Sequence, residues 1–103
     1  MPVVVTAKFT PKEGSFDQVV AALSPAIAEV HGEPGCLLYA IHETPEGHIL
    51  MIEKWESAEL LDAHGAGEPV KRLNASLDGL LQRPVEVARH EPIPAGTPVQ
   101  GIL

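Results

Sequence analysis

Three segments of this 103-residue chain carry apolar side chains at consecutive positions, and this pattern restricts the fold more than any other feature. They are Val3–Val5, Leu37–Tyr39 and Ile49–Ile52. Side chains of a β-strand alternate between the two faces of a sheet, so strands of this kind need cover on both faces. Where helices cover one face, the other needs a partner, and a second copy of the chain is the simplest one. We therefore expect a homodimer.

Four segments have the composition of strands and are punctuated by turn residues. They are Val3–Thr10, Cys36–Glu43, His48–Trp55 and Pro84–Ile93. The turn sequence 44–47 makes the middle two a hairpin. Between the first two strands, apolar residues recur at helical spacing from Phe16 to Val30, after Ser15 as the cap. Pro25 interrupts the backbone hydrogen bonding of this helix. Because the apolar stripe stays in phase across Pro25, we expect one kinked helix and not two helices.

Two shorter helices are expected between the hairpin and the last strand. One begins after Ser57 and ends at Gly65; the other begins near Pro69, and its apolar stripe continues to Leu81. The resulting order, βαββααβ, predicts an α+β fold with a ferredoxin-like, antiparallel four-stranded sheet. We expect residues 1–93 to form this domain and residues 94–103 to form a C-terminal tail, either loose or laid against another surface.

Charge and cysteine content exclude several classes of function. Asp and Glu outnumber Lys and Arg by 14 to 7, and the net charge of −7 argues against a nucleic-acid or anionic-membrane partner. A single cysteine, Cys36, excludes an internal disulfide. The N-terminus lacks a signal-peptide pattern and no apolar run is long enough to span a bilayer, so a cytoplasmic location is expected.

Polar residues at inward positions are the candidates for chemistry. In the third strand, Met51, Glu53 and Trp55 share one face, so a carboxylate lies in an apolar row beside the only tryptophan. Glu53 must therefore be hydrogen-bonded or have a shifted pKa; it is either a functional group or a structural carboxylate tied to the backbone or an Arg. His64 is either a core histidine or a base, and Asn74 either ties a helix to a loop or donates into a pocket.

The sequence contains no familiar metal or cofactor motif. His42 and His48 flank the hairpin turn but have no carboxylate or thiolate beside them to complete a metal site. No phosphate-binding loop, nucleophile elbow or zinc-protease helix is present. We therefore expect neither a metal nor a cofactor.

Three blocks of residues, with the spacing between them, resemble the antibiotic biosynthesis monooxygenase family. They are Glu33–Tyr39, Glu53–Ser57 and Asp62–His64, and the resemblance extends from the first strand to about Glu91. It implies homodimers in which two sheets pack face to face as a dimeric α+β barrel. It also implies oxidation of quinols, anthrones or related electron-rich phenols by O₂ without a cofactor.

The resemblance also implies a pocket between sheet and helices in each subunit. Trp55 matches the strand tryptophan of the family and His64 its helix histidine. On this basis His64 is expected to act as the base that removes a phenolic proton, while Trp55 and Asn74 orient the ring. Tyr39, Met51 and Glu53 are the expected substrate-binding residues, and Glu53 either tunes His64 or braces the strand.

Two alternatives to a cofactor-free oxygenase follow from the same resemblance. The haem-degrading branch of the superfamily has tryptophan in place of His64, histidine near Asn74 and an asparagine in the first strand. This chain has none of the three, so haem is not expected. The second alternative is a non-catalytic dimer that binds a small aromatic ligand, or a stress-related protein of the same fold.

Overall fold

Four antiparallel strands form one sheet in the computed structural model, which describes residues 1–103, in the order β2-β3-β1-β4. The strands are β1 (Val3–Phe9), β2 (Cys36–Glu43), β3 (Ile49–Trp55) and β4 (Glu86–His90). Each pair of neighbours is antiparallel, so β1 and β2 run in the same direction with β3 between them. This is the split βαβ arrangement, and the predicted ferredoxin-like α+β fold is confirmed.

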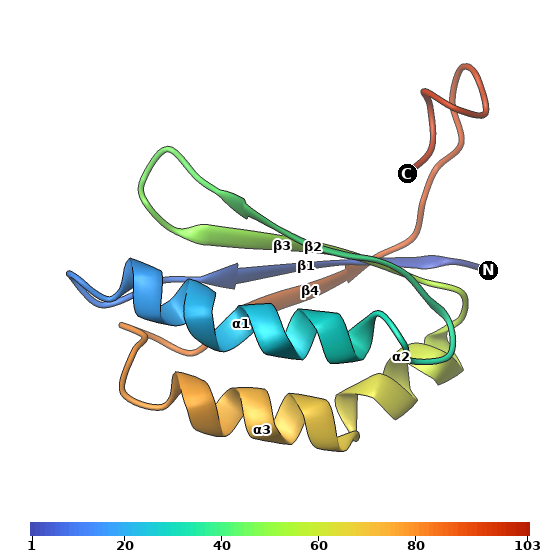
Figure 1. Cartoon of the computed structure of the whole chain (residues 1–103). Helices are drawn as coiled ribbons and strands as arrows, with labels where there is room; N and C mark the ends of the chain where they lie inside the picture. The colour runs from blue at the N-terminus through green and yellow to red at the C-terminus, as the bar shows by residue number, and fades with distance from the viewer.

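Three helices lie against one face of this sheet and leave the other face open (Figure 1). They are α1 (Phe16–Val30), α2 (Ala58–Gly65) and α3 (Glu68–Leu77). Helix α1 is continuous through Pro25, as its uninterrupted stripe predicted. None of the three helices combines the length and apolar character that a membrane crossing requires.

The C-terminal part of the chain differs from the prediction in two places. Helix α3 ends at Leu77 and does not continue to Leu81, because the chain turns at Gly79, which has a φ of +80°. Leu81 instead forms an isolated β-bridge with Pro11, so its helical spacing from Leu77 was coincidental. The last strand is only Glu86–His90, shorter than the predicted segment, because only these residues pair with β1.

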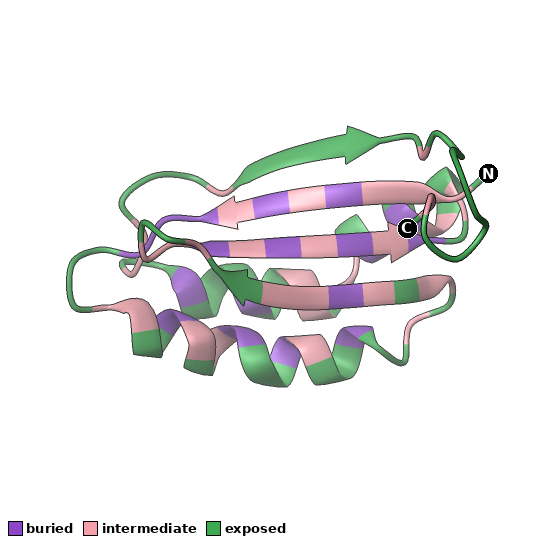
Figure 2. Ribbon diagram, turned by 90° about the horizontal axis from the view of Figure 1, so that it is seen from above, coloured by how far each residue is buried: buried purple, intermediate pink, exposed green.

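The two faces of the sheet differ in composition. Buried and half-buried residues alternate along β1 and β3, whereas β4 is exposed throughout (Figure 2). The face toward the helices holds the buried row of β3: Ile49, Met51, Glu53 and Trp55. Val4 and Ile52 of the open face are half-buried, but Thr6, Lys8 and Lys54 share that face. The open face is therefore a mixed surface and less apolar than the sequence pattern predicted.

Residues 94–103 extend from β4 and turn back on themselves on the side of the sheet opposite the helices (Figure 1). The Thr97 hydroxyl donates to the Gln100 side chain at 3.0 Å, and the Gly101 amide donates to the Thr97 carbonyl at 2.8 Å. Val99 is exposed, as is most of the tail. Its contacts are therefore largely internal.

The turn before β2 gives a first test of the packing. Gly35 has a φ of +85°, and a Cβ there would lie 2.5 Å from Leu60 Cδ1 of α2. Gly47 has a similar φ of +80° but open space around it, so it is a matched control. We expect Gly47→Ala to lower the free energy of unfolding by about 1 kcal/mol through backbone strain alone. Gly35→Ala should cost about 1–3 kcal/mol more, because α2 must shift. Urea unfolding of both variants measures the difference, and equal losses would contradict this packing.

Candidate functional site

A cavity of about 290 Å³ lies between the sheet and helices α2 and α3. Most of its walls are apolar, with Val5, Ala7, Phe9 and Met51 from the sheet and Leu61, Val70 and Leu73 from the helices. Five polar or amphipathic side chains complete it: Tyr39, Glu53, His64, Asn74 and Arg89. Five of the six residues that the sequence and the resemblance singled out therefore border one space, namely Tyr39, Met51, Glu53, His64 and Asn74. Trp55 does not.

His64 reaches the cavity from the inward side of α2. The Ser57 side chain caps this helix by accepting a hydrogen bond from the Leu60 amide at 3.2 Å. The cap fixes where the helix begins, so Leu61 and His64, three residues apart, both point inward and are buried. His64 is only 7% exposed.

A carboxylate from a distant part of the chain orients the His64 ring. The Nδ1 atom of His64 lies 2.9 Å from Oε1 of Glu33, in the turn between α1 and β2. An ionised carboxylate can only accept, so Nδ1 carries the proton and Nε2 is left as an acceptor. No hydrogen bond within the chain engages Nε2. The pair therefore leaves a proton-accepting nitrogen on a side chain that lines a largely apolar cavity.

Glu33 has a role that the sequence did not reveal. It belongs to the Glu33–Tyr39 block, but 31 residues separate it from His64. In the sequence, Glu33 is only an acidic residue in the turn after a helix, and acidic residues are common in surface turns. Only the packing of that turn against α2 identifies Glu33 as the partner of His64.

Glu53 is bound to the tryptophan two residues along the same strand. The Trp55 indole N–H donates to Glu53 Oε1 at 2.9 Å, and neither an Arg nor a backbone group is the partner. Glu53 is 6% exposed, and burial raises its pKa; the Trp55 hydrogen bond and the charge of His64 oppose the rise. Glu53 is therefore both hydrogen-bonded and shifted in pKa, as its place in an apolar row predicted. Its partner is an indole, so the alternative of a tie to the backbone or an Arg is wrong.

Three rings pack together at this end of the cavity. Trp55 and His64 have centroids 4.5 Å apart with planes inclined by 30°, so the indole face supports the imidazole. Tyr39 meets His64 edge-on, with centroids 5.4 Å apart. Burial, followed by the charge of Glu53, raises the Tyr39 pKa, so its hydroxyl stays protonated. Tyr39 is thus suited to donate a hydrogen bond and not to act as a base.

The remaining predicted residues lie at different depths. Met51 is fully buried in the sheet floor, and Asn74 is exposed where α3 borders the cavity, without a hydrogen bond from its side chain. Trp55 is fully buried and does not line the cavity. Its indole N–H is already engaged by Glu53, so Trp55 supports His64 from behind.

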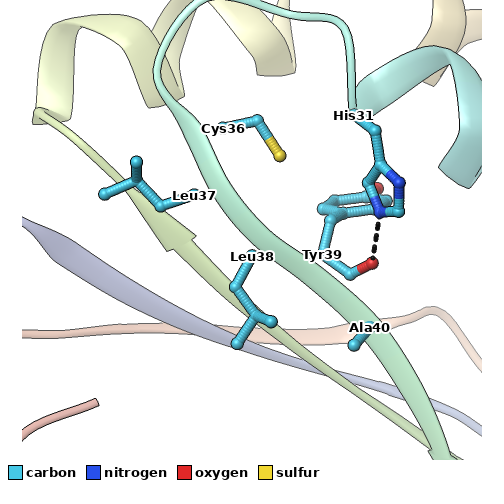
Figure 3. Close-up of a pocket in the computed structure, with 6 residues that line it drawn as sticks. All are labelled: His31, Cys36, Leu37, Leu38, Tyr39 and Ala40. Atoms are coloured by element: carbon cyan, nitrogen blue, oxygen red, sulfur yellow. Dashed lines mark hydrogen bonds between the residues drawn. The ribbon is translucent and has the colours of Figure 1, made fainter. Parts of the chain in front are cut away.

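A second hollow lies beside the edge strand β2 and shares Tyr39 with the cavity (Figure 3). It is lined by His31 and Cys36–Ala40, and the His31 Nε2 lies 3.0 Å from the Tyr39 carbonyl oxygen. At the hairpin, the His42 ring contacts the Leu50 carbonyl oxygen at 3.2 Å. No group of three His, Cys, Asp or Glu side chains in the chain is arranged to hold a metal ion.

Known proteins resemble this chain over most of its sequence and in its fold. A model of the family described as antibiotic biosynthesis monooxygenase matches residues 2–76. The protein named "Putative monooxygenase Rv0793" from Mycobacterium tuberculosis is 30% identical over 93 residues, which is 89% of this chain and 92% of that protein.

Two solved structures show the same architecture. The structure of Rv0793 superimposes with a TM-score of 0.86 at 28% identity, covering 94% of this chain and 100% of that one. The structure of PA3566 from Pseudomonas aeruginosa gives a TM-score of 0.81 at 26% identity, covering 89% of this chain and 94% of that one.

The raised pKa of Glu53 predicts a pH-dependent stability difference. An acid whose pKa is higher in the folded state destabilises that state when ionised, and this cost disappears as the pH falls through the folded pKa. Glu53→Gln removes the charge but keeps an oxygen that can accept the Trp55 N–H. We expect the variant to resist urea better than the parent at about pH 8, with the difference shrinking toward about pH 5.

The exposed Glu56 provides the control for this comparison. Glu56→Gln makes the same change of charge without altering a buried group, so its stability relative to the parent should vary little with pH. A Glu53→Gln variant that is less stable than the parent at the higher pH would contradict the assigned burial cost.

Proposed function

The chain belongs to the antibiotic biosynthesis monooxygenase family, and from this premise we propose that it oxidises a quinol, an anthrone or a related electron-rich aromatic with O₂ and without a cofactor. The observation that carries the proposal is the Glu33–His64 pair, whose free Nε2 belongs to a side chain lining an apolar cavity. Such a cavity suits an aromatic ring, and such a nitrogen suits removal of a phenolic proton.

His64 would start the reaction by making the substrate a stronger reductant. Nε2 accepts the phenolic proton, and the resulting phenolate gives one electron to O₂. The two radicals then combine at a ring carbon that bears hydrogen, and His64 returns its proton to the resulting peroxide. Loss of water, which takes the hydrogen from that carbon, leaves a new carbonyl. The overall reaction balances: the substrate supplies the four electrons that O₂ takes up, one oxygen atom enters the product and the other leaves as water.

The neighbouring groups would stabilise the charges that arise. Glu33 accepts the Nδ1 hydrogen bond, so it holds the ring in place and stabilises the imidazolium that forms. The Trp55 face packed against His64 favours the same cation. The Tyr39 hydroxyl and the Asn74 amide are donors for the phenolate oxygen, and the apolar walls keep water away from the radical pair.

Glu53 and Trp55 would act as a support and not as direct reactants. The Trp55 N–H is committed to Glu53, and its ring lies behind His64. Trp55→Phe keeps the stacking surface but leaves the buried Glu53 without its donor. Its effect on catalysis should therefore come through a displaced His64 ring.

Oxygen consumption tests the proposed reaction directly. A panel of quinols and polycyclic phenols should include a compound that the protein oxidises faster than it autoxidises in buffer. We expect His64→Ala to slow that oxidation by about 10²–10⁴-fold, because the base is lost. Glu33→Gln should lower kcat with little change in KM, since Glu33 positions the base and does not touch the substrate.

The exposed His42 supplies the control, because His42→Ala removes an imidazole that does not line the cavity and should leave the rate unchanged. Thermal unfolding of each variant separates a lost base from a lost fold. If no compound reacts faster than in buffer, while aromatic compounds still bind, the protein is a non-catalytic aromatic-binding module and the proposed oxidation is wrong.

We also propose that two copies associate through the open face of the sheet. No helix covers this face, and Val4, Leu50 and Ile52 lie on it, half-buried. Burial of these side chains against a second copy would remove apolar surface from water, and the small polar Thr6 fits within such an interface. A face-to-face pair of sheets is the dimeric α+β barrel that the resemblance implies.

Sedimentation equilibrium measures the state of association. We expect a mass twice the chain's 11.0 kDa at micromolar concentration. Ile52→Asp, which places a charge at the centre of the open face, should give the mass of one chain or unfold the protein. Gln18→Asp on the exposed side of α1 is the control and should leave the mass unchanged. A parent protein of single-chain mass would contradict the proposal.

A further inference from the structure

Arg89 is the only cationic side chain that lines the cavity. It lies on β4 and pairs with Val5 of β1. On the other side of β1, Val5 pairs with Glu53 of β3. Arg89 and Glu53 therefore flank Val5 on the same face, with their Cα atoms separated by two strand spacings, or about 10 Å. One edge of the cavity is cationic and the other, next to His64, is acidic.

The Arg89 side chain extends from β4 toward α2. Its Nη2 donates to Asp62 Oδ1 at 2.7 Å, and this is the only hydrogen bond of the guanidinium. A guanidinium has five N–H donors, so most of them remain available where β4 borders the cavity. Both partners of the pair are more than half exposed, at 51% for Arg89 and 66% for Asp62, and a pair in that setting adds little stability. Stability therefore does not account for this arginine.

We propose that Arg89 determines specificity by binding a carboxylate substituent of the aromatic substrate, so that the substrate class is that of phenolic acids. This inference rests on the proposed function. The chain has a net charge of −7, and Arg89 is the only Lys or Arg side chain on the cavity wall, whereas Glu53 lies at the opposite edge. An anionic substituent therefore binds only at the Arg89 edge, where a guanidinium can donate two parallel hydrogen bonds to it. With the carboxylate held at Arg89, the uncharged hydroxyl lies toward Glu53 and His64.

Binding under anaerobic conditions tests the inference without any turnover. The probes are 2,5-dihydroxybenzoate and its methyl ester, which differ in the negative charge, and affinity is measured by calorimetric titration. We expect the acid to bind about tenfold more tightly than the ester. Arg89→Gln should remove this preference by weakening the acid alone.

Arg72→Gln is the matched control, because it makes the same change of net charge outside the cavity. Arg72 is exposed on α3 and is paired with Glu29 of α1. This variant should keep the preference for the acid. Asp62→Asn leaves the guanidinium in place and frees it from its partner, so acid binding should be retained or strengthened.

Three results would overturn the inference. They are equal affinity of the parent for acid and ester, no binding of the acid, and a loss of acid binding in Asp62→Asn as large as in Arg89→Gln. The last result would give the Arg89–Asp62 pair a purely structural role. Oxygen uptake is measured separately, so an Arg89-dependent preference without oxidation would contradict the proposed oxidation while leaving the carboxylate site in place.

Discussion

The hydrogen bond between Glu33 and His64 is the contact around which the candidate site is arranged. It joins the turn after α1 to α2, two parts of the chain that share no backbone hydrogen-bond ladder. The contact needs α2 to lie close to that turn, and Gly35 permits this approach because a side chain there would collide with Leu60. One short turn thus positions a helix and sets the tautomer of the histidine on it.

Two carboxylates near the same histidine, one half-buried and one buried, have different partners and therefore different properties. Glu33 accepts from the imidazole and retains one oxygen that is buried without a partner. Glu53 accepts from the Trp55 indole, and burial raises its pKa. The first can stabilise a positive charge that forms on His64. The second accepts the indole N–H of Trp55, whose ring packs against the same imidazole.

Incomplete helical cover gives the cavity its opening. Helices lie over one face of the sheet, yet Val87 of β4, which points to that face, is 64% exposed. Residues from β4 and α3 therefore border the cavity where the helix layer ends, and Asn74 and Arg89 lie among them. A fully covered sheet would have filled this space with core side chains. The polar groups needed for recognition are found where packing is incomplete, because their desolvation costs least there.

The sequence by itself determined the order of the elements and the inward row of β3, because hydrophobic periodicity depends only on local spacing. It also placed Glu53 and His64 on buried faces. Only the tertiary structure decided which distant groups complete the site, since Glu33 and Arg89 lie far from His64 along the chain and look like ordinary surface residues in the sequence. Periodicity assigns a side chain to a face but carries no information about which distant segment packs against it; that is decided by the packing of turns and helices on the sheet.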